Sequence, residues 1–476
     1  MSSFEPLSFA DLRGKNVALW GVGKEGAASY LYLKSLGVTP LLADTKERSQ
    51  ISGLEGENFD FVRLTDGDIS PLLACEVVIK APGISRYCIE AEELAKNGVR
   101  VAGGMALFLE GREKENIIMV TGTKGKSTTT SLIAHLLSSL GEKAGSFGNL
   151  GTVPWDPRSG FDECNWAVIE VSSFQTADLC SAGATAVVTA LAPDHLDWHR
   201  GDLKTYYRDK LRLCTLPGVE RVIVNGDDVN LQENAVLLGP SPSMVCYDED
   251  AAEKYLPGFS LPGVYNKRNA LLALEVIKSI GMAADEESLV KALSTFSPLP
   301  HRMEKVAEYG GIQFIDDGLA TNALPTAAAL SAYADHPVAI ILGGSDRGID
   351  YSELIGALRH HGQPLCMLVL SEAGRRIAEK YLAETDETVE QHPDGHFLLR
   401  NSGGKRTDIC ICETLKVALR EGFVWAKSLS ERKTARSPVI LLSPAAPSFS
   451  QYRNYLERSE DFAAQVEAII AEEERF

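Results

Sequence analysis

The segment of this chain best suited to chemistry is residues 117–130, with the sequence IIMVTGTKGKSTTT. Four apolar residues run into a glycine-rich turn, and hydroxyl residues that can open a helix follow. Such a turn aims backbone N–H groups and a helix N-terminus at one point, which suits a phosphate. Lys126 would reach the terminal phosphates, and Ser127 or Thr128 would offer a hydroxyl to Mg²⁺. The predicted phosphate loop comprises Gly122, Thr123, Lys124, Gly125, Lys126, Ser127 and Thr128.

The spacing of this loop departs from the usual pattern. Only two residues separate Gly122 from Gly125, whereas four separate the glycines of G-x-x-x-x-G-K-[ST]. A glycine turn with an incidental lysine is therefore the structural alternative. The apolar strand before the loop and the helix start after it favour a phosphate site.

An acid and three polar side chains follow a second apolar strand. Glu170 comes directly after the strand predicted at residues 166–169, and Ser172, Ser173 and Gln175 follow it. Polar groups are costly to bury without partners, so this cluster is expected to face a ligand or a cleft. A satisfied network inside the core is the alternative. Glu170 is a candidate partner for Mg²⁺.

A third strand, predicted at residues 186–190, leads to Asp194 and His195. Mg²⁺ prefers oxygen ligands, which makes Asp194 the more obvious ligand, whereas a zinc ion would favour the histidines. Lys210 lies on a helix predicted over residues 205–213. For a lone helix lysine, the residues alone favour a solvated surface charge.

The N-terminal region carries a second glycine pattern. The strand predicted at residues 16–20 leads into Gly21-Val-Gly-Lys-Glu-Gly26, and Asp44 follows about 18 positions later. This arrangement is typical of a dinucleotide site, which holds a pyrophosphate and a ribose. On its own the pattern is a weak signal, and a helix–strand turn without a ligand remains open.

Composition limits the class of protein. A chain of 476 residues with 45% hydrophobic and 24% charged residues predicts a globular α/β protein of about three domains. The net charge of −18 argues against nucleic-acid or anionic-membrane binding. No basic or apolar leader and no membrane-spanning run is present in the sequence, so a cytoplasmic protein is expected. The nine cysteines form no C-x-x-C pair and are expected to be reduced and buried.

The C-terminal region repeats the pattern of strands ending in polar loops. Strands are predicted at residues 312–315, 338–342 and 439–442, which indicates another open parallel sheet. Residues 460–476 are predicted to form a covering helix without chemistry. The expected domains are 1–106, 107–297 and 298–476.

Together these motifs resemble the Mur ligases, which build the peptide of peptidoglycan by ATP-driven amide formation. The resemblance spans almost the whole chain and rests on segments that occur in the family's order. These are 122–128, Gly148-Asn149, 170–175, 194–197, Asn266 to Asn269, Pro300-His301-Arg302, Asp317 with 320–322, and 342–344. Residues 172–175 and 442–445 are similar to the member that adds glutamate to UDP-N-acetylmuramoyl-L-alanine.

The resemblance implies an α/β fold of three domains. The first would be Rossmann-like and hold the UDP group, the second would resemble a P-loop ATPase, and the third would be Rossmann-like and hold glutamate. The residues expected to bind the UDP-linked substrate are Gly23, Lys24, Asp44, Thr45, Asn149 and Ser172. Those expected near glutamate are Thr321, Arg347, Ser448 and Phe449.

By the same resemblance, ATP phosphorylates the substrate carboxylate and an amine attacks the acyl phosphate. Lys126, His195, Lys210 and Arg302 would be catalytic, and the expected metal residues are Ser127, Glu170, His195 and Lys210. Lys210 matches a lysine that carries CO₂ as a carbamate, which reverses the surface interpretation. Asn269 would contact the adenine side of ATP, and Arg302 with Asp317 would add further ATP contacts. The implied cofactors are ATP and Mg²⁺, the implied substrates are small molecules, and a monomer is expected.

The glutamate isomer stays open between D and L. Gly318 and Leu319 stand where D-glutamate enzymes often show serine and lysine, and residues 103–108 also favour an L-glutamate branch. A folylpolyglutamate synthase is a second enzyme hypothesis, but it has no UDP-binding first domain. A non-catalytic Mur-like protein and a nicotinamide dehydrogenase are further alternatives. The dehydrogenase would leave the Lys126 loop unexplained.

Overall fold

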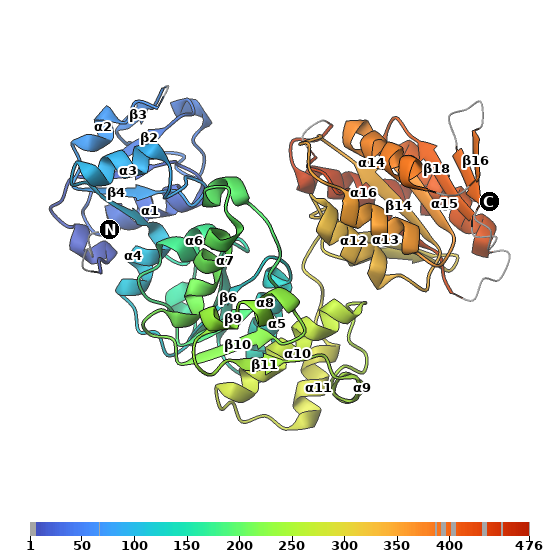
Figure 1. Cartoon of the computed structure of the whole chain (residues 1–476), viewed down its shortest axis with the longest axis horizontal. Coiled ribbons are helices and arrows are strands. Elements are labelled where there is room, and N and C mark those ends of the chain that lie inside the picture. The colour runs from blue at the N-terminus through green and yellow to red at the C-terminus, as the bar shows by residue number, and fades with distance from the viewer. Residues whose placement is uncertain are drawn as a thin grey trace. The chain divides into compact units, whose positions relative to one another are not determined.

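The computed structural model describes residues 6–65, 67–385, 388–391, 397–400, 406–430, 436–448 and 451–475. The chain divides into two compact units. The first contains Met1–Phe259 and Asn266–Phe296, and the second contains Ser260–Tyr265 and Ser297–Phe476. Three sheets follow one another along the chain (Figure 1). The mixed helix and sheet architecture confirms the predicted α/β fold, while the domain boundaries at 106 and 297 stay predictions.

The N-terminal sheet is parallel, with strand order β3-β2-β1-β4-β5. Its strands are β1 (Val17–Trp20), β2 (Leu41–Asp44), β3 (Phe61–Arg63), β4 (Val77–Lys80) and β5 (Arg100–Gly103). Its helices are α1 (Lys24–Ser35), α2 (Ser70–Leu73), α3 (Ile89–Lys96) and α4 (Gly104–Glu110). Val17 and Leu19 of β1 belong to one hydrophobic core, and Ala18 and Trp20 belong to another. Because successive side chains point to opposite faces, a continuously apolar strand fits a sheet covered on both sides.

The middle sheet is also parallel, with strand order β11-β10-β9-β6-β8-β7. Its strands are β6 (Ile117–Thr121), β7 (Ala144–Gly148), β8 (Trp166–Glu170), β9 (Thr185–Val188), β10 (Arg221–Asn225) and β11 (Ser243–Val245). Its helices are α5 (Lys126–Ser139), α6 (Ser173–Asp178), α7 (Leu203–Leu211), α8 (Val229–Glu233), α9 (Glu249–Tyr255), α10 (Val264–Ser279) and α11 (Glu286–Ser294). Parallel pairing brings the carboxyl ends of β6, β8 and β9 to one edge, where the predicted site residues begin.

The first two sheets share a core, which explains why they form one unit. Phe9, Phe108 and Trp155 pack in a single hydrophobic cluster, with the Trp155 ring centroid 6.0 Å from Phe9 and 5.8 Å from Phe108. Trp155 Nε1 donates to Ser29 Oγ on α1 at 3.0 Å. The buried indole is therefore satisfied at its polar edge as well as packed on its faces.

The C-terminal sheet has strand order β12-β13-β19-β14-β15-β18-β17-β16. Its strands are β12 (Glu304–Tyr309), β13 (Ile312–Asp316), β14 (Val338–Gly343), β15 (Leu365–Leu370), β16 (Thr388–Gln391), β17 (Phe397–Arg400), β18 (Arg406–Ile411) and β19 (Val439–Leu442). The strands from β13 to β18 in this order are parallel, but β12, β17 and β16 pair antiparallel. The expectation of an open parallel sheet is therefore right for the centre and wrong for both edges.

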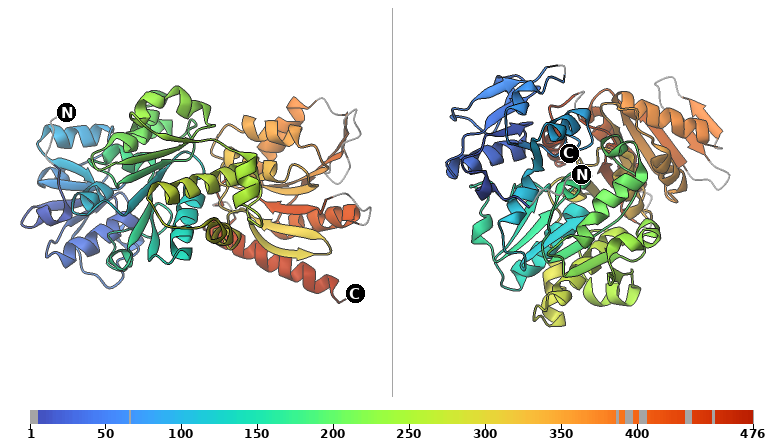
Figure 2. Two further views of the ribbon diagram at one scale, coloured as in Figure 1. Left: turned by 90° about the horizontal axis from the view of Figure 1, so that it is seen from below. Right: turned by 60° about the vertical axis from the view of Figure 1, so that its left-hand side comes forward.

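Helices cover the C-terminal sheet. They are α12 (Ala323–Ala332), α13 (Ser352–His360), α14 (Ser371–Glu384), α15 (Leu415–Ser430) and α16 (Tyr455–Glu473). Residues of α15 and α16 share a core with Phe314, Ile341 and Leu442, so these two helices pack on the same face. Figure 2 shows α16 in red beside the strands of this sheet. The C-terminal helix begins at Tyr455, five residues before the predicted start, and this brings Arg458 into its first turns.

All nine cysteines are free thiols, as expected. The expectation of burial is right for Cys214, Cys366, Cys410 and Cys412 only. Three of the others are half-buried, and Cys180 and Cys246 are exposed, so the expectation is wrong for these five. In the part of the chain that the structure describes, no helix combines the length and apolar character needed to cross a bilayer.

Candidate active site

The predicted phosphate loop joins β6 to α5 through two glycines with positive φ. Gly122 has φ +145° and Gly125, the N-cap of α5, has φ +83°. A Cβ at Gly122 would lie 2.1 Å from Thr189 Oγ1, and one at Gly125 would lie 2.7 Å from Asn269 Oδ1. Only glycine fits both the backbone conformation and the space. The loop therefore folds as the sequence predicts, with the N-terminus of α5 at its end.

Side chains of the loop are held from within and by the segment that follows β9. Lys126 Nζ donates to the carbonyl oxygens of Gly122 at 3.0 Å and Thr123 at 3.3 Å. Thr123 Oγ1 donates to Ala192 O at 3.0 Å. Ser127 is buried in the first turn of α5, whereas Lys124 and Thr128 are half-buried. The lysine thus lies over the loop where a phosphate charge would lie.

Glu170 ends β8 inside this edge and is 2% exposed. Its Oε1 accepts from Asn149 Nδ2 at 3.0 Å. Its Oε2 is buried and has no hydrogen-bond partner among the described residues. An unpaired buried carboxylate oxygen is costly, and a cation ligand would satisfy it. The donor set here therefore fits Mg²⁺.

Lys210 comes from α7 and is 2% exposed, so the surface-charge interpretation drawn from the residues alone is wrong. Its Nζ donates to Gly122 O at 2.9 Å. Burial lowers the pKa of the Lys210 amine well below its usual value, and the nearby Lys126 cation lowers this pKa further. Asp194 and Glu170 act in the opposite direction. The fold therefore favours a neutral amine beside the phosphate loop.

His195 lies at the start of the 3₁₀ helix η4 (Leu196–His199) with a left-handed backbone, φ +48°. Its ring packs 5.1 Å from Phe174, and its Nε2 lies 3.6 Å from Asp194 Oδ2. Burial lowers the pKa of His195, and Asp194 opposes this while Lys210 and Lys126 add to it. A neutral imidazole is the form that binds a metal. Both candidates, Asp194 and His195, thus lie beside the loop.

The polar cluster after Glu170 divides into two parts. Ser173 is 2% exposed and Gln175 is 4% exposed, and both are satisfied by other side chains. Ser172 forms a capping box with Gln175 at the start of α6, and Gln175 Nε2 donates to Glu25 Oε1 at 2.6 Å. For Ser173 and Gln175 the expectation of a ligand-facing position is wrong, because they form a core network. Ser172 stays partly exposed.

Asn269 on α10 is 5% exposed and lies against the phosphate loop, as the contact at Gly125 shows. Its Nδ2 has no hydrogen-bond partner among the described residues. Asn266, one turn earlier, is also buried. The shared face of the two amides is confirmed, while the adenine contact stays a prediction.

The N-terminal motif places Gly23 and Lys24 at the exposed start of α1. Asp44 at the end of β2 is 8% exposed, and its Oδ2 accepts from Val22 N at 2.6 Å. The next residue, Thr45, is exposed. Lys24 also lines a cavity of about 310 Å³ with residues 151–153 of the middle domain. Asp44 therefore shapes the glycine turn, and the cavity lies beside the predicted UDP residues.

In the second unit, Asp317 follows β13 and is 7% exposed. Ser443 Oγ donates to its Oδ2 at 2.7 Å. Burial raises the pKa of Asp317 to about 7, although Ser443 and the Arg302 cation lower it. Arg302 stands between His301 with φ +62° and Met303 with φ +51°. Two left-handed residues are strained, and strain of this kind gathers at functional sites.

The residues predicted near glutamate lie on loops at the carboxyl ends of the C-terminal strands. Thr321 is half-buried after β13, Arg347 is exposed after β14, and Ser448 is buried after β19. Phe449 lies outside the described residues. Arg458 of α16 joins these loops, because its guanidinium donates to the carbonyl oxygens of Gly318, Gly343 and Ala446 at 3.0–3.4 Å.

The structure thus brings the predicted loop, metal and lysine residues of the middle sheet together at its carboxyl edge, whereas the predicted UDP residues lie at the ends of β1 and β2 in the N-terminal sheet. Sequence reasoning assigned no role in the site to Arg458, nor to three side chains that bond to one another beside His195 and Lys210, namely Tyr87, His199 and Asp209. Each of the last two stands within four positions of a predicted residue, His195 or Lys210. Their position next to these residues is the signal that could have identified them.

Comparison with known proteins gives the same family over the whole chain. The Mur ligase middle domain matches residues 120–256. A UDP-N-acetylmuramoyl-L-alanine–L-glutamate ligase of Micromonospora sp. is 34% identical over 485 residues, covering 97% of this chain and 98% of that protein. Another of Xanthomonas oryzae pv. oryzae is 33% identical and covers 96% of both chains.

The UDP-N-acetylmuramate-alanine ligase structure from Thermotoga maritima shares the fold. It aligns with a TM-score of 0.55 and 18% identity over 95% of this chain and 99% of that chain. Full-length identity above 30% and the three-sheet fold confirm the resemblance drawn from the motifs. This protein belongs to the Mur ligase family.

Proposed function

We propose that this protein is an ATP-dependent ligase that joins L-glutamate to UDP-N-acetylmuramoyl-L-alanine in peptidoglycan precursor synthesis. D-Glutamate is the alternative amino acid. The proposal places the enzyme in the cytoplasm, as a monomer. It combines the site described above with the names of the relatives that match the whole chain.

One observation supports the reaction most directly. Lys126 and Lys210 converge on the Gly122 carbonyl, and Glu170 presents an unpaired carboxylate oxygen at the same edge. A substrate carboxylate that approaches a triphosphate brings two anions together. Lys126 offsets this repulsion and holds the phosphates in line for transfer.

The proposed metal residues are Ser127, Glu170, His195 and Lys210. When bound, Mg²⁺ would neutralise phosphate charge during transfer. Glu170 is suited to this role by its free oxygen, and His195 by a pKa that burial lowers. These assignments explain why an acid and an imidazole lie beside the phosphate loop.

Lys210 is proposed to carry CO₂ as a carbamate. Only an unprotonated amine adds CO₂, and the pKa of Lys210 is lowered well below its usual value. The addition forms an N–C bond and releases the amine proton. It replaces a buried amine with an oxygen ligand of the kind that Mg²⁺ prefers.

The proposed reaction has two steps. A carboxylate oxygen of the alanine residue attacks the γ-phosphorus of ATP, and ADP leaves. The glutamate amine then attacks the acyl carbon, and phosphate leaves with the oxygen that came from the carboxylate. Lys126 stabilises the charge of the transferred group, Asn149 and Ser172 orient the muramoyl substrate, and Asn269, Arg302 and Asp317 are assigned to ATP.

The UDP group is assigned to the N-terminal domain. Gly23, Lys24, Asp44 and Thr45 lie at the carboxyl ends of β1 and β2, where open α/β sheets bind ligands. The neighbouring cavity of about 310 Å³ supports this assignment, because Lys24 supplies a cation for a diphosphate at its wall.

Glutamate is assigned to Thr321, Arg347, Ser448 and Phe449, with the guanidinium of Arg347 suited to a carboxylate. The L isomer is supported by the relatives' names and by Gly318. A Cβ at Gly318 would lie 2.2 Å from Ser459 Oγ, so this chain has no room there for the serine of D-glutamate enzymes without rearrangement.

Incubation with ATP, Mg²⁺ and UDP-N-acetylmuramoyl-L-alanine, and with either L- or D-glutamate, tests the function. We expect phosphate release with L-glutamate only. Release with D-glutamate only would overturn the isomer, and release with neither would reject the ligase. Lys126→Ala should abolish release and leave binding of the UDP substrate within about twofold, because that binding is assigned to a different domain.

A further inference from the structure

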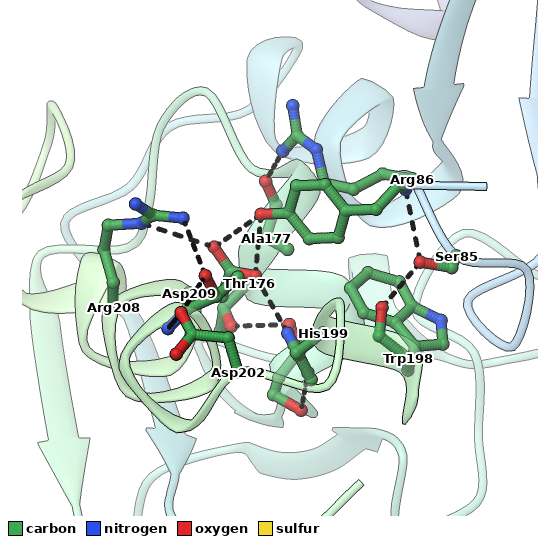
Figure 3. Close-up of polar contacts among 12 residues, drawn as sticks. Ser85, Arg86, Thr176, Ala177, Trp198, His199, Asp202, Arg208 and Asp209 are labelled. Atoms are coloured by element: carbon green, nitrogen blue, oxygen red, sulfur yellow. Dashed lines mark hydrogen bonds and ion pairs between the residues drawn. The ribbon is translucent and has the colours of Figure 1, made fainter. Parts of the chain in front are cut away.

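A chain of four side chains runs beside the proposed metal residues, and we name it the Tyr87–Ser173 network. Tyr87 OH donates to Asp209 Oδ1 at 2.9 Å and Oδ2 at 2.8 Å. His199 Nδ1 lies 2.9 Å from Asp209 Oδ2, and His199 Nε2 lies 3.0 Å from Ser173 Oγ. Figure 3 shows His199 and Asp209 at its centre.

The direction of these hydrogen bonds follows from chemistry. A carboxylate only accepts, so Tyr87 and His199 Nδ1 both donate to Asp209. Burial and the Asp209 charge raise the pKa of Tyr87, which keeps its proton in place. In a neutral His199, Nε2 then accepts from the hydroxyl of Ser173. Every member has a fixed role, and a fully satisfied network is rigid.

The order Ser–His–Asp is also that of a hydrolytic triad, but burial argues against that function here. Ser173 is 2% exposed, Asp209 is 5% exposed and His199 is fully buried. A substrate carbonyl could not reach Ser173 Oγ without unfolding the start of α6. The network is therefore suited to holding the backbone and not to attacking a substrate.

Each member from the middle domain adjoins a segment of the proposed site. Ser173 follows Ser172, and Asp209 precedes Lys210. His199 ends η4, whose N-cap is His195. Three separate segments of the chain are thus tied together by side chains that stand one to four residues away from the residues proposed to act.

The backbone of η4 needs such support. His195 before it has φ +48° and Arg200 after it has φ +62°, so left-handed residues flank both ends. Non-glycine residues hold this conformation only where surrounding contacts impose it. His199 supplies such contacts through its two ring nitrogens.

The N-terminal domain supplies the outer end of the network. Tyr87 lies on the loop between β4 and α3. The same loop forms two hydrogen bonds with Trp198 of η4. Ser85 Oγ donates to Trp198 O at 2.6 Å, and Trp198 Nε1 donates to Pro82 O at 3.0 Å. The loop that carries Tyr87 thus contacts η4 directly as well as through Asp209 and His199.

We propose that Tyr87 and Asp209 are positioning residues for the ligase reaction, which hold His199 and thereby set His195, Ser172 and Lys210 for metal and substrate. The inference rests on the proposed function. None of the network residues touches the reacting atoms, so they act through their neighbours. Residues that orient metal ligands in this way commonly change metal affinity or activity by about 10- to 100-fold.

Tyr87→Phe tests the proposal, because it removes the hydroxyl and keeps the ring. We expect kcat to fall about tenfold, the Mg²⁺ concentration for half-maximal rate to rise at least about threefold, and the KM for the UDP substrate to stay within about twofold. Titration calorimetry of ADP with Mg²⁺ gives a readout without turnover, and its affinity should fall in parallel.

Tyr30→Phe is the matched control. Tyr30 is 1% exposed, and its hydroxyl donates to Asn58 O at 2.8 Å within the N-terminal domain. The Tyr30→Phe substitution therefore also removes a tyrosine hydroxyl, but at a position outside the Tyr87–Ser173 network. Wild-type kcat and Mg²⁺ dependence in Tyr87→Phe would overturn the proposal. An equal loss of kcat in both variants, in step with Tm, would also overturn it by showing only a structural role.

Asp209→Asn and the double variant with Tyr87→Phe test whether the two residues act together. If Tyr87 acts through Asp209, the double variant should match Asp209→Asn within about twofold. Multiplying effects would contradict the network. If the wild type forms no product, the proposed function fails, while the calorimetric comparison of wild type and Tyr87→Phe still decides the positioning role.

Discussion

Lys126 and Lys210 share one acceptor, since both Nζ atoms donate to the carbonyl oxygen of Gly122, at 3.0 Å and 2.9 Å. Two cations at one oxygen repel each other, so one of them is favoured in its neutral form. Lys210 is the more deeply buried, and its pKa is lowered well below the usual value. Burial and the neighbouring charge therefore favour Lys126 as the cation of the site and Lys210 as the neutral amine.

Lys210 should make stability depend on pH. Between the lowered folded pKa and the usual 10.5, the unfolded chain binds a proton that the folded chain does not. The free energy of unfolding of the wild type therefore rises with pH, by at most about 1.4 kcal/mol per unit. Lys210→Met removes this dependence and should raise Tm at pH 7 while abolishing activity.

Lys204→Met on the same helix is the control, because Lys204 is exposed. The Tm of the wild type and of both variants would be measured by thermal unfolding from pH 6 to 9 in CO₂-free buffer. Lys204→Met should follow the wild type. A Lys210→Met variant that is less stable at pH 7 would show that Lys210 is stabilising in the fold, contrary to this account.

Gly122→Ala should disable the phosphate loop. The new Cβ would meet Thr189 Oγ1 at 2.1 Å and the backbone of Ala190 at 3.0 Å, in a region of positive φ. We expect binding of an ATP analogue to weaken more than about tenfold. Gly141 also has a positive φ, +93°, but a Cβ there would lie in open space, so Gly141→Ala should leave nucleotide binding unchanged. Equal binding of the ATP analogue by both variants would show that this loop does not bind ATP.

Asp317 should give the opposite pH dependence in the second unit. Burial raises its pKa to about 7, so between 3.8 and about 7 the folded chain binds a proton that the unfolded chain does not. Stability is therefore lost as pH rises through this window, by at most about 1.4 kcal/mol per unit. Asp317→Asn should flatten the dependence in unfolding experiments from pH 4.5 to 7. Asp335→Asn, an exposed control, should not.

Arg458→Met should loosen the loops of the C-terminal sheet. Arg458 is 3% exposed and donates to carbonyls of Gly318, Gly343 and Ala446, so its loss removes a buried donor from each of them. We expect a cost of about 2–4 kcal/mol and faster hydrogen exchange at residues 316–322 and 343–348. Arg420→Met, which breaks the exposed pair with Glu472, should cost less than about 1 kcal/mol. Unchanged exchange in Arg458→Met would show that the loops do not depend on it.

Local patterns predicted the parts of the molecule that short segments determine. The loop from Gly122 to Thr128 follows from an apolar strand, two glycines and a hydroxyl-rich helix start. The strand β19 has the predicted ends, because buried parallel strands are apolar throughout. Polar residues follow such apolar strands at the carboxyl edge of a parallel sheet, and this located Glu170 at the end of β8 and His195 after β9.

Features that depend on long-range packing could not be predicted from the sequence. Lys210 appears as an ordinary helix lysine until α7 packs against Gly122, 88 positions earlier. Tyr87 and Asp209 are 122 positions apart, and neither has a local pattern that indicates pairing. The antiparallel edges of the C-terminal sheet likewise depend on which strands meet. The family resemblance, and not the spacing, predicted that Lys210 lies beside the phosphate loop, while its role there stays a prediction.

The most direct test of the central claim follows an oxygen atom. UDP-N-acetylmuramoyl-L-alanine labelled with ¹⁸O in its carboxylate is incubated with the protein, ATP, Mg²⁺ and L-glutamate, and the released phosphate is examined by mass spectrometry. If the carboxylate is activated as an acyl phosphate, each phosphate carries one ¹⁸O and one amide product forms with it. Unlabelled phosphate, or phosphate formed without the amide, would contradict the account.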